Sequence, residues 1–403
     1  MGGQRTRDLD AVKNAAALSL APLTIGLARF GYAVLLPAMR TNLHWTFAQA
    51  GALNTGNGLG YLAGALLTPV VARGLGERRA FLLSFAVVAG GLAASACTVD
   101  YALLLAARTL AGIAIAVLYV VGATMAARVA DESSSPALVL GLYFAGVGPG
   151  ILISSALAPL VLGSPAGWRA AWLVMAGATA MSAIVAARAS RQVRGGPGAP
   201  GHSRRLGPIV WAMAAFTLYG LGYSSYMTFI VAYYVASGRS ATAVALFWAL
   251  LAVAATASGL AWRTALDRLP GGGGLALSIL TVALGSALPL VSPSVALMIV
   301  SALLFGGAFL AVSTALAQVV RRTLTPASRA AGLGLSTALF AAGQAAGPLV
   351  TGIAADRTGH LASGLALSTL CLALGALAAL RQPSAAVGAA AGSGPARREE
   401  GTT

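Results

Sequence analysis

Two arginines lie inside stretches of sequence that are otherwise apolar and long enough to cross a bilayer. Arg29 belongs to the segment GLARFGY at residues 26–32, and Arg108 to the segment RTLAG at residues 108–112. A charge at the centre of a membrane-spanning helix costs roughly 2.5–3.5 kcal/mol on insertion scales, so such a side chain faces a protein interior or a water-filled cavity. The planar guanidinium suits carboxylate or phosphate, which it binds through two parallel hydrogen bonds. Together the two residues predict a site for an anion.

No acidic side chain is placed to neutralise either arginine. All ten carboxylates fall in predicted loops, tails or span ends: Asp8, Asp10, Glu77, Asp100, Asp131, Glu132, Asp267, Asp356, Glu399 and Glu400. A buried cation needs a counter-charge or water. We hypothesise that the substrate is the counter-charge, a small organic anion bound between Arg29 and Arg108. Two structural alternatives stay open: Arg108 bonds backbone carbonyls beside Gly112, and Arg29 has a purely structural role.

Aromatic and amide side chains are predicted to line the same cavity. Tyr219, Tyr223 and Tyr226 repeat at helical spacing on one face. The other candidates are Tyr32, one turn from Arg29, Asn54 and Asn57 in one stripe, Tyr119 on the face of Arg108, and Gln344. Packing between helices or an interfacial belt explains the tyrosines equally well. Hydrogen bonds between helices explain the asparagines.

The composition indicates a polytopic membrane protein. Hydrophobic residues make up 58% of the 403 and charged residues only 9%, which is more apolar surface than a soluble core absorbs. Twelve apolar runs reach the roughly 20 residues needed to cross a bilayer. They fall near residues 14–37, 46–72, 80–99, 101–126, 137–162, 168–188, 207–236, 241–262, 273–291, 294–319, 327–354 and 361–380. We predict an all-α protein of twelve transmembrane helices.

The runs form two groups of six, separated by a polar break that is rich in glycine and proline. We predict an N-terminal six-helix bundle at residues 1–188, a cytoplasmic linker at 189–206 and a C-terminal six-helix bundle at 207–381. Residues 382–403 are rich in alanine, glycine, serine and proline, and are predicted to be a disordered tail.

The distribution of basic residues predicts the orientation of the chain. The net charge of +16 sits in short loops between apolar runs and forms no basic domain, so it does not indicate nucleic acid. With the N-terminus inside, most of the arginines are cytoplasmic, and only Arg40, Arg169, Arg239 and Arg357 fall on the other side. This bias predicts that both termini are cytoplasmic. The single lysine beside abundant Ala, Gly and Arg is typical of a GC-rich bacterial gene, which favours the inner membrane.

Landmarks recur between the two halves. Gly26 and Tyr32 correspond to Gly220 and Tyr226 at one offset of 194 residues, and Pro149 in the fifth run corresponds to Pro348 in the eleventh. Two parallel six-helix halves related by an axis along the membrane normal are a transporter architecture. We therefore expect pseudo-symmetric bundles that move against one another.

These features together resemble the major facilitator superfamily over nearly the whole chain. The segment LGERR at residues 75–79 is similar to the end of the superfamily's loop motif, although its usual aspartate is missing. A second copy, DRLPG at residues 267–271, keeps the acid. Residues 108–112 are similar to the Arg-x-x-x-Gly motif of span four, and residues 146–150 to the Gly-Pro motif of span five. The segment at residues 26–32, with NTGN at 54–57, resembles the YbfB/YjiJ branch.

The resemblance implies alternating access around a central cavity beside spans one and four. Glycine and proline in spans five and eleven would supply sliding surfaces, although packing alone explains them as well, and loop charges would latch the inner gate. The residues assigned to gating are Arg73, Gly76, Glu77, Arg78, Arg79, Gly146, Gly148, Pro149, Asp267, Arg268, Gly343, Gly347 and Pro348.

The predicted spans contain no Asp, Glu or His in their interior, and this restricts the possible modes of energy coupling. Proton relays use intramembrane Asp, Glu or His, and His44, His202 and His360 all fall in loops. We expect uniport, anion exchange, or co-transport with the proton carried on the substrate. A nucleotide-binding loop is absent, and Cys97 and Cys371 form no metal motif, so no cofactor or metal is expected. The expected partners are lipid and a small, anionic substrate, and the protein is expected to be monomeric.

Three other functions compete with the transport of an anion. Efflux of a lipophilic drug or metabolite is the alternative within the same fold, although drug sites usually include an intramembrane acid. A polytopic membrane enzyme, such as an acyl- or glycosyltransferase, needs clustered Asp, His or Ser at a membrane edge. A receptor or scaffold would have a sizeable soluble domain. The sequence favours a secondary transporter over these, with a small organic anion as substrate.

Overall fold

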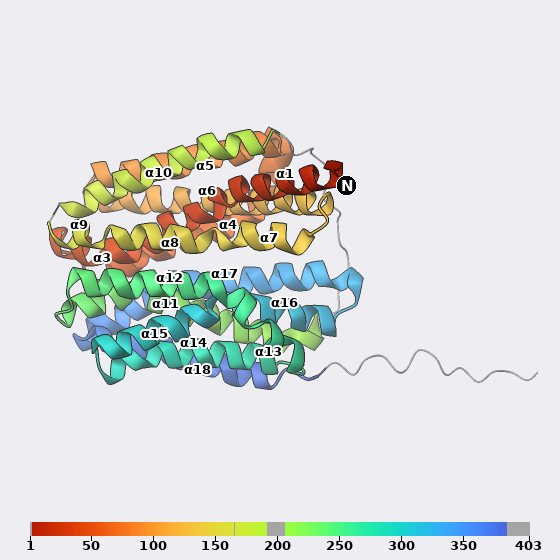
Figure 1. Ribbon diagram of the computed structural model, residues 1–403. Coiled ribbons are helices and arrows are strands. Elements are labelled where there is room, and N and C mark those ends of the chain that lie inside the picture. The colour runs from red at the N-terminus through yellow and green to blue at the C-terminus, as the bar shows by residue number, and fades with distance from the viewer. Residues whose placement is uncertain (1, 165, 192–205, 385–403) are drawn as a thin grey trace, which may run out of the picture.

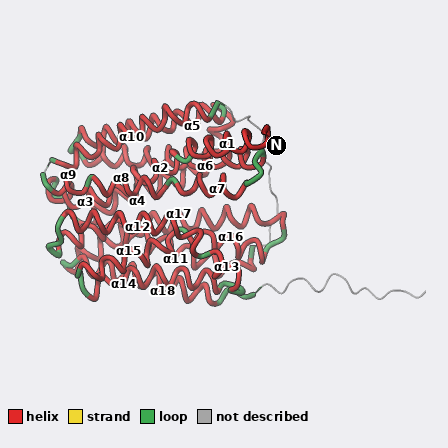
Figure 2. The backbone as a smooth tube through the Cα atoms, in the orientation of Figure 1, coloured by secondary structure: helices red, strands yellow, loops and turns green. Residues whose placement is uncertain are grey.

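Long helices in two bundles make up the molecule (Figure 1). The computed structural model describes residues 2–164, 166–191 and 206–384. Those residues are almost all helical, and no strand occurs among them (Figure 2). The predicted linker lies largely outside the described residues, as does the predicted tail from residue 385 onward.

The N-terminal bundle runs from red to yellow-green in Figure 1. Its first span is a chain of short helices, α1 (Gly2–Leu18), α2 (Leu20–Ile25), the π-helix η1 (Gly26–Phe30) and α3 (Gly31–Asn42). The others are α4 (Phe47–Leu75), α5 (Glu77–Cys97), α6 (Tyr101–Asp131), a fifth span made of α7 (Pro136–Ala145), α8 (Val147–Ala156) and α9 (Ala158–Leu162), and α10 (Gly167–Ala189).

The C-terminal bundle runs from green to blue. A short 3₁₀ turn, η2 (Gly207–Ile209), leads into α11 (Val210–Ala236), followed by α12 (Ala241–Ala261), α13 (Arg263–Arg268) and α14 (Gly273–Val291). The tenth span is α15 (Val295–Phe309) with α16 (Ala311–Thr323), and the last two are α17 (Pro326–Thr358) and α18 (Leu361–Leu380).

The prediction of twelve spanning helices in two bundles is confirmed. Eleven helical stretches of the described chain are long and apolar enough to cross a membrane. The remaining long helix, α11, has 27 residues, which is about 40 Å at 1.5 Å per residue. Tyrosines and serines lower its hydropathy, and most of its side chains are buried in the protein. A helix enclosed by other helices can carry polar groups that a lipid-facing helix cannot.

Glycines set the closest helix contacts. A Cβ on Gly150 of α8 would overlap the carbonyl oxygen of Leu23 and the backbone of Gly26, so the fifth span lies directly against the first. In the other half, Gly343 and Gly347 of α17 lie in the same way against Thr217 and Leu221 of α11. Small residues let helix backbones approach in lipid, where no hydrophobic force drives them together.

The two halves are joined near one end of the molecule. We call the end with Asp8 and Gln382 the terminal end, and the end with the turns at residues 43–46 and 359–360 the distal end. The hydrogen bonds between halves join four regions: Phe47 and Ala48 with Asp356, Asn54 with Thr228, Thr55 with Ala345, and Ser154 with Trp248. All of these lie in the distal half, and no hydrogen bond joins the halves nearer the terminal end within the described chain.

Candidate functional site

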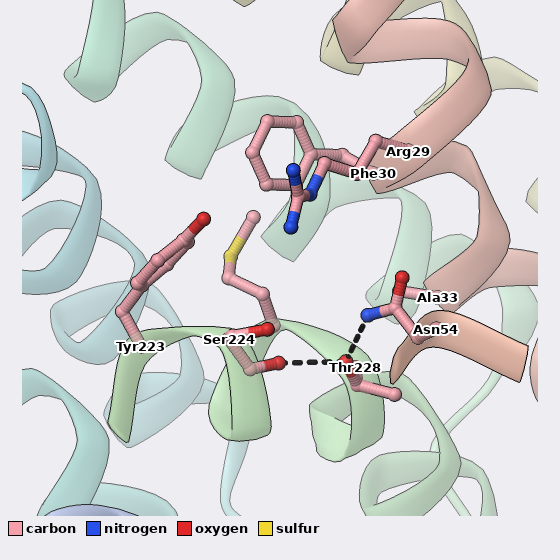
Figure 3. A pocket seen from close by; sticks show the side chains of 8 residues that line it. Arg29, Phe30, Ala33, Asn54, Tyr223, Ser224 and Thr228 are labelled. Carbon is pink, nitrogen blue, oxygen red and sulfur yellow. Dashed lines mark hydrogen bonds between the residues drawn. The ribbon is translucent and has the colours of Figure 1, made fainter. Parts of the chain in front are cut away.

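A pocket lies where the two bundles meet, near the middle of the long helices (Figure 3). About 240 Å³ of space not filled by atoms lies here, including space that is open to the surroundings. Its lining comes from both halves: Arg29, Phe30, Ala33 and Asn54 from the first, and Tyr223, Ser224, Met227 and Thr228 from the second. A ligand held here would contact both bundles at once.

Arg29 is the charged group of this pocket. It lies in the π-helix η1, where the Gly31 N–H donates to the carbonyl of Gly26, five residues earlier. The side chain is only 6% exposed and extends toward the C-terminal bundle (Figure 3). Its Nη2 is buried without a hydrogen-bond partner among the described residues. The ring of Tyr61, whose centroid is 5.3 Å from Cζ, is its aromatic neighbour.

Arg108 has a different environment and does not line the pocket. Its Nη1 donates to the carbonyl of Ala28 at 2.6 Å, which ties α6 to the π-helix. Its Cζ is 5.1 Å from the ring centroids of both Tyr32 and Trp172, an arrangement in which aromatic faces stabilise a cation. Its Nε and Nη2 have no partner within the described chain. The sequence placed an anion between the two arginines, but only Arg29 reaches this pocket.

Hydrogen bonds between side chains fix the polar groups around Arg29. The Nδ2 of Asn54 donates to Oγ1 of Thr228 at 2.6 Å, and that hydroxyl donates in turn to the carbonyl of Ser224 at 2.6 Å. The hydroxyl of Tyr223 donates to Oε1 of Gln344. Oδ1 of Asn54 and Nε2 of Gln344 are buried without a partner among the described residues.

The remaining predicted binding residues do not line this pocket. The hydroxyls of Tyr32 and Tyr219 donate to the carbonyls of Ala50 and Phe309, at 2.8 and 2.7 Å. Tyr226 shares a hydrogen bond of 2.6 Å with Ser301. Asn57 donates to the carbonyl of Arg108 at 2.9 Å, and the carbonyl of Tyr119 accepts from Tyr143. These contacts hold helices together.

The sequence prediction missed five residues of the lining: Phe30, Ala33, Ser224, Met227 and Thr228. A signal for three of them was present. Ser224, Met227 and Thr228 follow Tyr223 by one, four and five residues, which places the four residues on one face of a helix. The polar members of that face lie on the helix with the most tyrosines. Phe30 and Ala33 carry no chemical signal beyond their closeness to Arg29.

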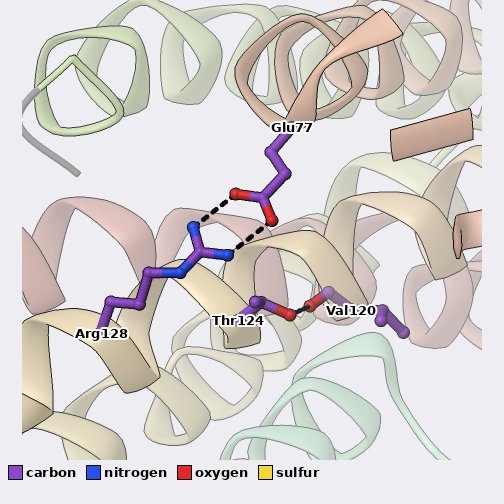
Figure 4. A network of polar contacts seen from close by, with 4 residues as sticks. All are labelled: Glu77, Val120, Thr124 and Arg128. Carbon is purple, nitrogen blue, oxygen red and sulfur yellow. Dashed lines mark hydrogen bonds and ion pairs between the residues drawn. The ribbon is translucent and has the colours of Figure 1, made fainter. Parts of the chain in front are cut away.

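The predicted gating residues fall into separate groups. Arg128 of α6 binds Glu77 at the start of α5 through two hydrogen bonds of 2.5 and 2.6 Å, within the N-terminal bundle (Figure 4). Gly76 has a φ of 78°, which lets the chain turn sharply between α4 and α5. The sequence prediction assigned Glu77 but not its partner Arg128. In the C-terminal bundle Asp267 accepts from Gln318 at 3.3 Å.

The other gating candidates divide between contacts within a half and contacts across the two halves. Arg73 donates to the carbonyl of Pro69, and Gly146 packs against Ser19, both within the N-terminal half. Gly148 instead faces Thr256 of α12, and the carbonyl of Pro348 faces Gly51 of α4. Arg78, Arg79, Pro149 and Arg268 complete the predicted set, and the gating role of every member of the set stays a prediction.

No metal site is formed by the described residues, because three or more His, Cys, Asp or Glu side chains do not gather anywhere among them. Arg29 is a cation, and the amide, hydroxyl and aromatic groups beside it offer hydrogen bonds and apolar contact. The chemistry available at this pocket is the reversible binding of a small molecule.

Comparison with known proteins places this geometry in a family. The sequence model for the uncharacterised MFS-type transporter YbfB matches residues 21–380. Among solved structures, a point mutant of the nucleoside transporter NupG superposes with a TM-score of 0.75 at 14% identity, over 93% of this chain and 99% of that one. A bacterial homologue of the human lysosomal transporter Spinster, inward-facing and unoccupied, superposes at 0.67 and 15% identity, over 93% and 95%. No curated protein sequence matches. By the extent of the sequence match, the chain belongs to the YbfB family of MFS-type transporters.

Proposed function

We propose that this transporter carries a small organic anion of the carboxylate type. The supporting observation is Arg29, which lines a pocket between the bundles with its Nη2 buried and unpartnered within the described chain. None of the carboxylates in the described part of the chain lines the pocket; most of them lie in loops or near helix ends, and Asp8 and Asp10 lie within α1. An unpaired buried cation is costly, and a carboxylate ligand offsets that cost through a charge-assisted, two-pronged hydrogen bond.

We further propose that the terminal end faces the cytoplasm and that the membrane is the inner membrane. The arginine-rich turns lie at that end, and basic loops stay on the cytoplasmic side. The hydrogen bonds between the halves then close the pocket toward the outside. Tyr61, Tyr119 and Phe340, which lie closer to the terminal end, are partly exposed. Rocking of one bundle against the other would expose the pocket to each side in turn.

The proposed coupling follows from the same absence of intramembrane acids. A proton relay carried by the protein needs an Asp, Glu or His within a span, and the described spans hold none beside the pocket. Three modes of transport need no proton carrier in the protein: exchange of one anion for another, uniport, and entry of a protonated acid. Uptake with and without a pH gradient separates these modes, and pH-driven uptake of a neutral substrate would contradict all three.

The test of the proposed function is transport by purified protein in liposomes, with a panel of two- to four-carbon carboxylates and matched neutral alcohols. Wild-type protein should take up at least one carboxylate. Arg29→Gln should lower the affinity by about tenfold or more, the value of a hydrogen bond to a charged group, and Arg29→Lys should retain part of it. The matched control is Arg191→Gln, which removes an exposed arginine just beyond the end of α10. Equal uptake by Arg29→Gln would overturn the proposal.

A further inference from the structure

The pocket around Arg29 contains a further buried polar atom without a partner among the described residues, besides the positive guanidinium. Asn54 is 7% exposed and lines the pocket. Its amide orientation is fixed by Thr228, because the only hydroxyl proton of Thr228 is already donated to the carbonyl of Ser224. Thr228 therefore accepts from Nδ2 of Asn54, and Oδ1 of Asn54 is left as an acceptor with no partner in the described chain. A buried amide oxygen in that state calls for a donor.

Two hydroxyl groups of α11 can make further hydrogen bonds with a ligand. Tyr223 donates its proton to Gln344, so its oxygen can only accept from a molecule in the pocket. Ser224 is 4% exposed and lines the pocket, and its side chain makes no hydrogen bond with other described residues. Within this small space Arg29 donates, Asn54 and Tyr223 accept, and the Ser224 hydroxyl can do either. A ligand that fits carries both a negative charge and at least one O–H or N–H group.

The charges around the pocket favour a hydroxyl over an ammonium as the donor group of the ligand. An amino acid would bring a second, positive charge into the pocket, where the fixed charge is already the cation Arg29 and the described lining contains no carboxylate. A hydroxyl donates the same hydrogen bond without a charge. The apolar lining, Phe30, Ala33 and Met227, suits contact with a short aliphatic chain.

From these observations we infer that the ligand is a small hydroxycarboxylate, whose carboxylate binds Arg29 and whose hydroxyl proton is donated to Oδ1 of Asn54 or to the oxygen of Tyr223. The inference rests on the proposed anion transport and adds the second functional group. Because Arg29 and Asn54 belong to one bundle and Tyr223 to the other, such a ligand bridges the two moving halves.

Matched acids that differ by one hydroxyl test the inference directly. Binding to the purified protein is measured by calorimetry for acetate and glycolate, propionate and lactate, and succinate and malate, with alanine as the ammonium analogue of lactate. Where either member of a pair binds, the hydroxylated member should bind about five- to tenfold more tightly, since the analogue leaves a buried acceptor unpaired. Alanine should bind more weakly than lactate.

Variants of Tyr223 and Asn54 test which acceptor causes the preference for the hydroxylated acid. Tyr223→Phe keeps the ring and should reduce the preference for the hydroxylated acid, and Asn54→Leu should abolish most of the remainder, each measured as the ratio of the two affinities within a pair. Tyr233→Phe is the control, because that hydroxyl, on the same helix, donates to the carbonyl of Pro289. Equal affinities within every pair, or alanine binding as tightly as lactate, would overturn the inference while anion transport stands. Absence of binding by every carboxylate would overturn both.

Discussion

At the scale of single residues, two buried arginines with similar sequence surroundings have different physical roles. Arg108 is 2% exposed, but a backbone carbonyl and two aromatic faces surround its guanidinium. Arg29 is nearly as buried and has one aromatic neighbour and no hydrogen bond from the described chain. The first arrangement compensates part of its charge within the protein, although Nε and Nη2 have no partner among the described residues. The second leaves the compensation to something that enters the pocket.

This difference predicts opposite effects of one substitution at the two positions. Arg108→Gln removes the bond to Ala28 and the contacts with Tyr32 and Trp172, and should cost about 1.5–3 kcal/mol of stability, the range for a hydrogen bond from a charged group. Arg29→Gln should leave the ligand-free melting temperature unchanged or higher, because it removes an unpaired buried charge. Thermal unfolding in detergent measures both, with carboxylate binding in parallel. A larger stability loss at Arg29 than at Arg108 would contradict the assignment.

The sequence could indicate Arg29 and its missing partner, but not the separation of the two roles. The count of acidic residues and the length of the apolar runs are one-dimensional facts, and they led to Arg29. The contact of Arg108 with Ala28 depends on how α6 crosses the first span, which periodicity does not encode. The same limit applies to Tyr32, Tyr219 and Tyr226, whose spacing is right for a lining but whose hydroxyls bond neighbouring helices.

At the scale of elements, the position of Arg29 depends on the π-helix η1 and on the helix packed against it. Single π turns occur often at functional sites, because the wider turn changes the direction of the side chains it carries. Gly150 of α8 lies against Leu23 and Gly26, with no room for a Cβ between them. The fifth span therefore supports the turn that carries Arg29.

Gly150→Ala should disturb this support. The added methyl group would meet backbone atoms of the first span, which cannot move aside as a flexible side chain does, and overpacking of this kind costs about 1–3 kcal/mol. We expect a lower melting temperature and weaker carboxylate binding. Gly141→Ala in α7 is the matched control: its Cβ would meet nothing within 4 Å, and alanine is the better helix former. Equal behaviour of the two variants would show that this packing does not matter.

Apolar periodicity predicted the long helices within a few residues at most ends, because every span must satisfy its own backbone in lipid. The apolar pattern did not predict where the regular α-helix of a span is interrupted. The first span contains η1, and the tenth changes from α15 to α16 at Leu310. Gln382, predicted to begin the tail, is 3% exposed and donates to the carbonyl of Pro208 at 2.8 Å. Such features depend on neighbours distant in sequence.

At the scale of the whole molecule, the contacts between bundles are asymmetric along the long axis. The hydrogen bonds between them lie in the distal half, from Asn54 and Thr228 near the pocket to Asp356 at the distal end, whereas the packing of Gly148 against Thr256 lies nearer the terminal end. The sequence fits this arrangement and its opposite equally well, because alternating access uses the same helices in both. The conformation was therefore beyond prediction, whereas the division into two bundles followed from the repeated landmarks.

Asp356 is the outermost of these contacts and predicts how the distal end opens. Its Oδ1 and Oδ2 accept from the N–H groups of Phe47 and Ala48, at 2.9 and 2.8 Å, at the first turn of α4 in the other bundle. These N–H groups have no partner within their own helix, and the positive helix end favours a carboxylate. Asp356→Asn removes the charge and one acceptor, which at an exposed site costs about 0.3–1 kcal/mol.

Because that contact exists only while the distal end is closed, its loss should raise the population of distal-open molecules about two- to fivefold. Spin labels at Thr41 and Val291, both exposed and near the distal end of opposite bundles, should show a larger long-distance fraction once Cys97 and Cys371 are replaced. The control is Asp100→Asn, whose carboxylate accepts from Leu103 at 2.8 Å at a helix start of the same end, within one bundle. An unchanged distance distribution in Asp356→Asn, or the same shift in the control, would contradict a latch at this position.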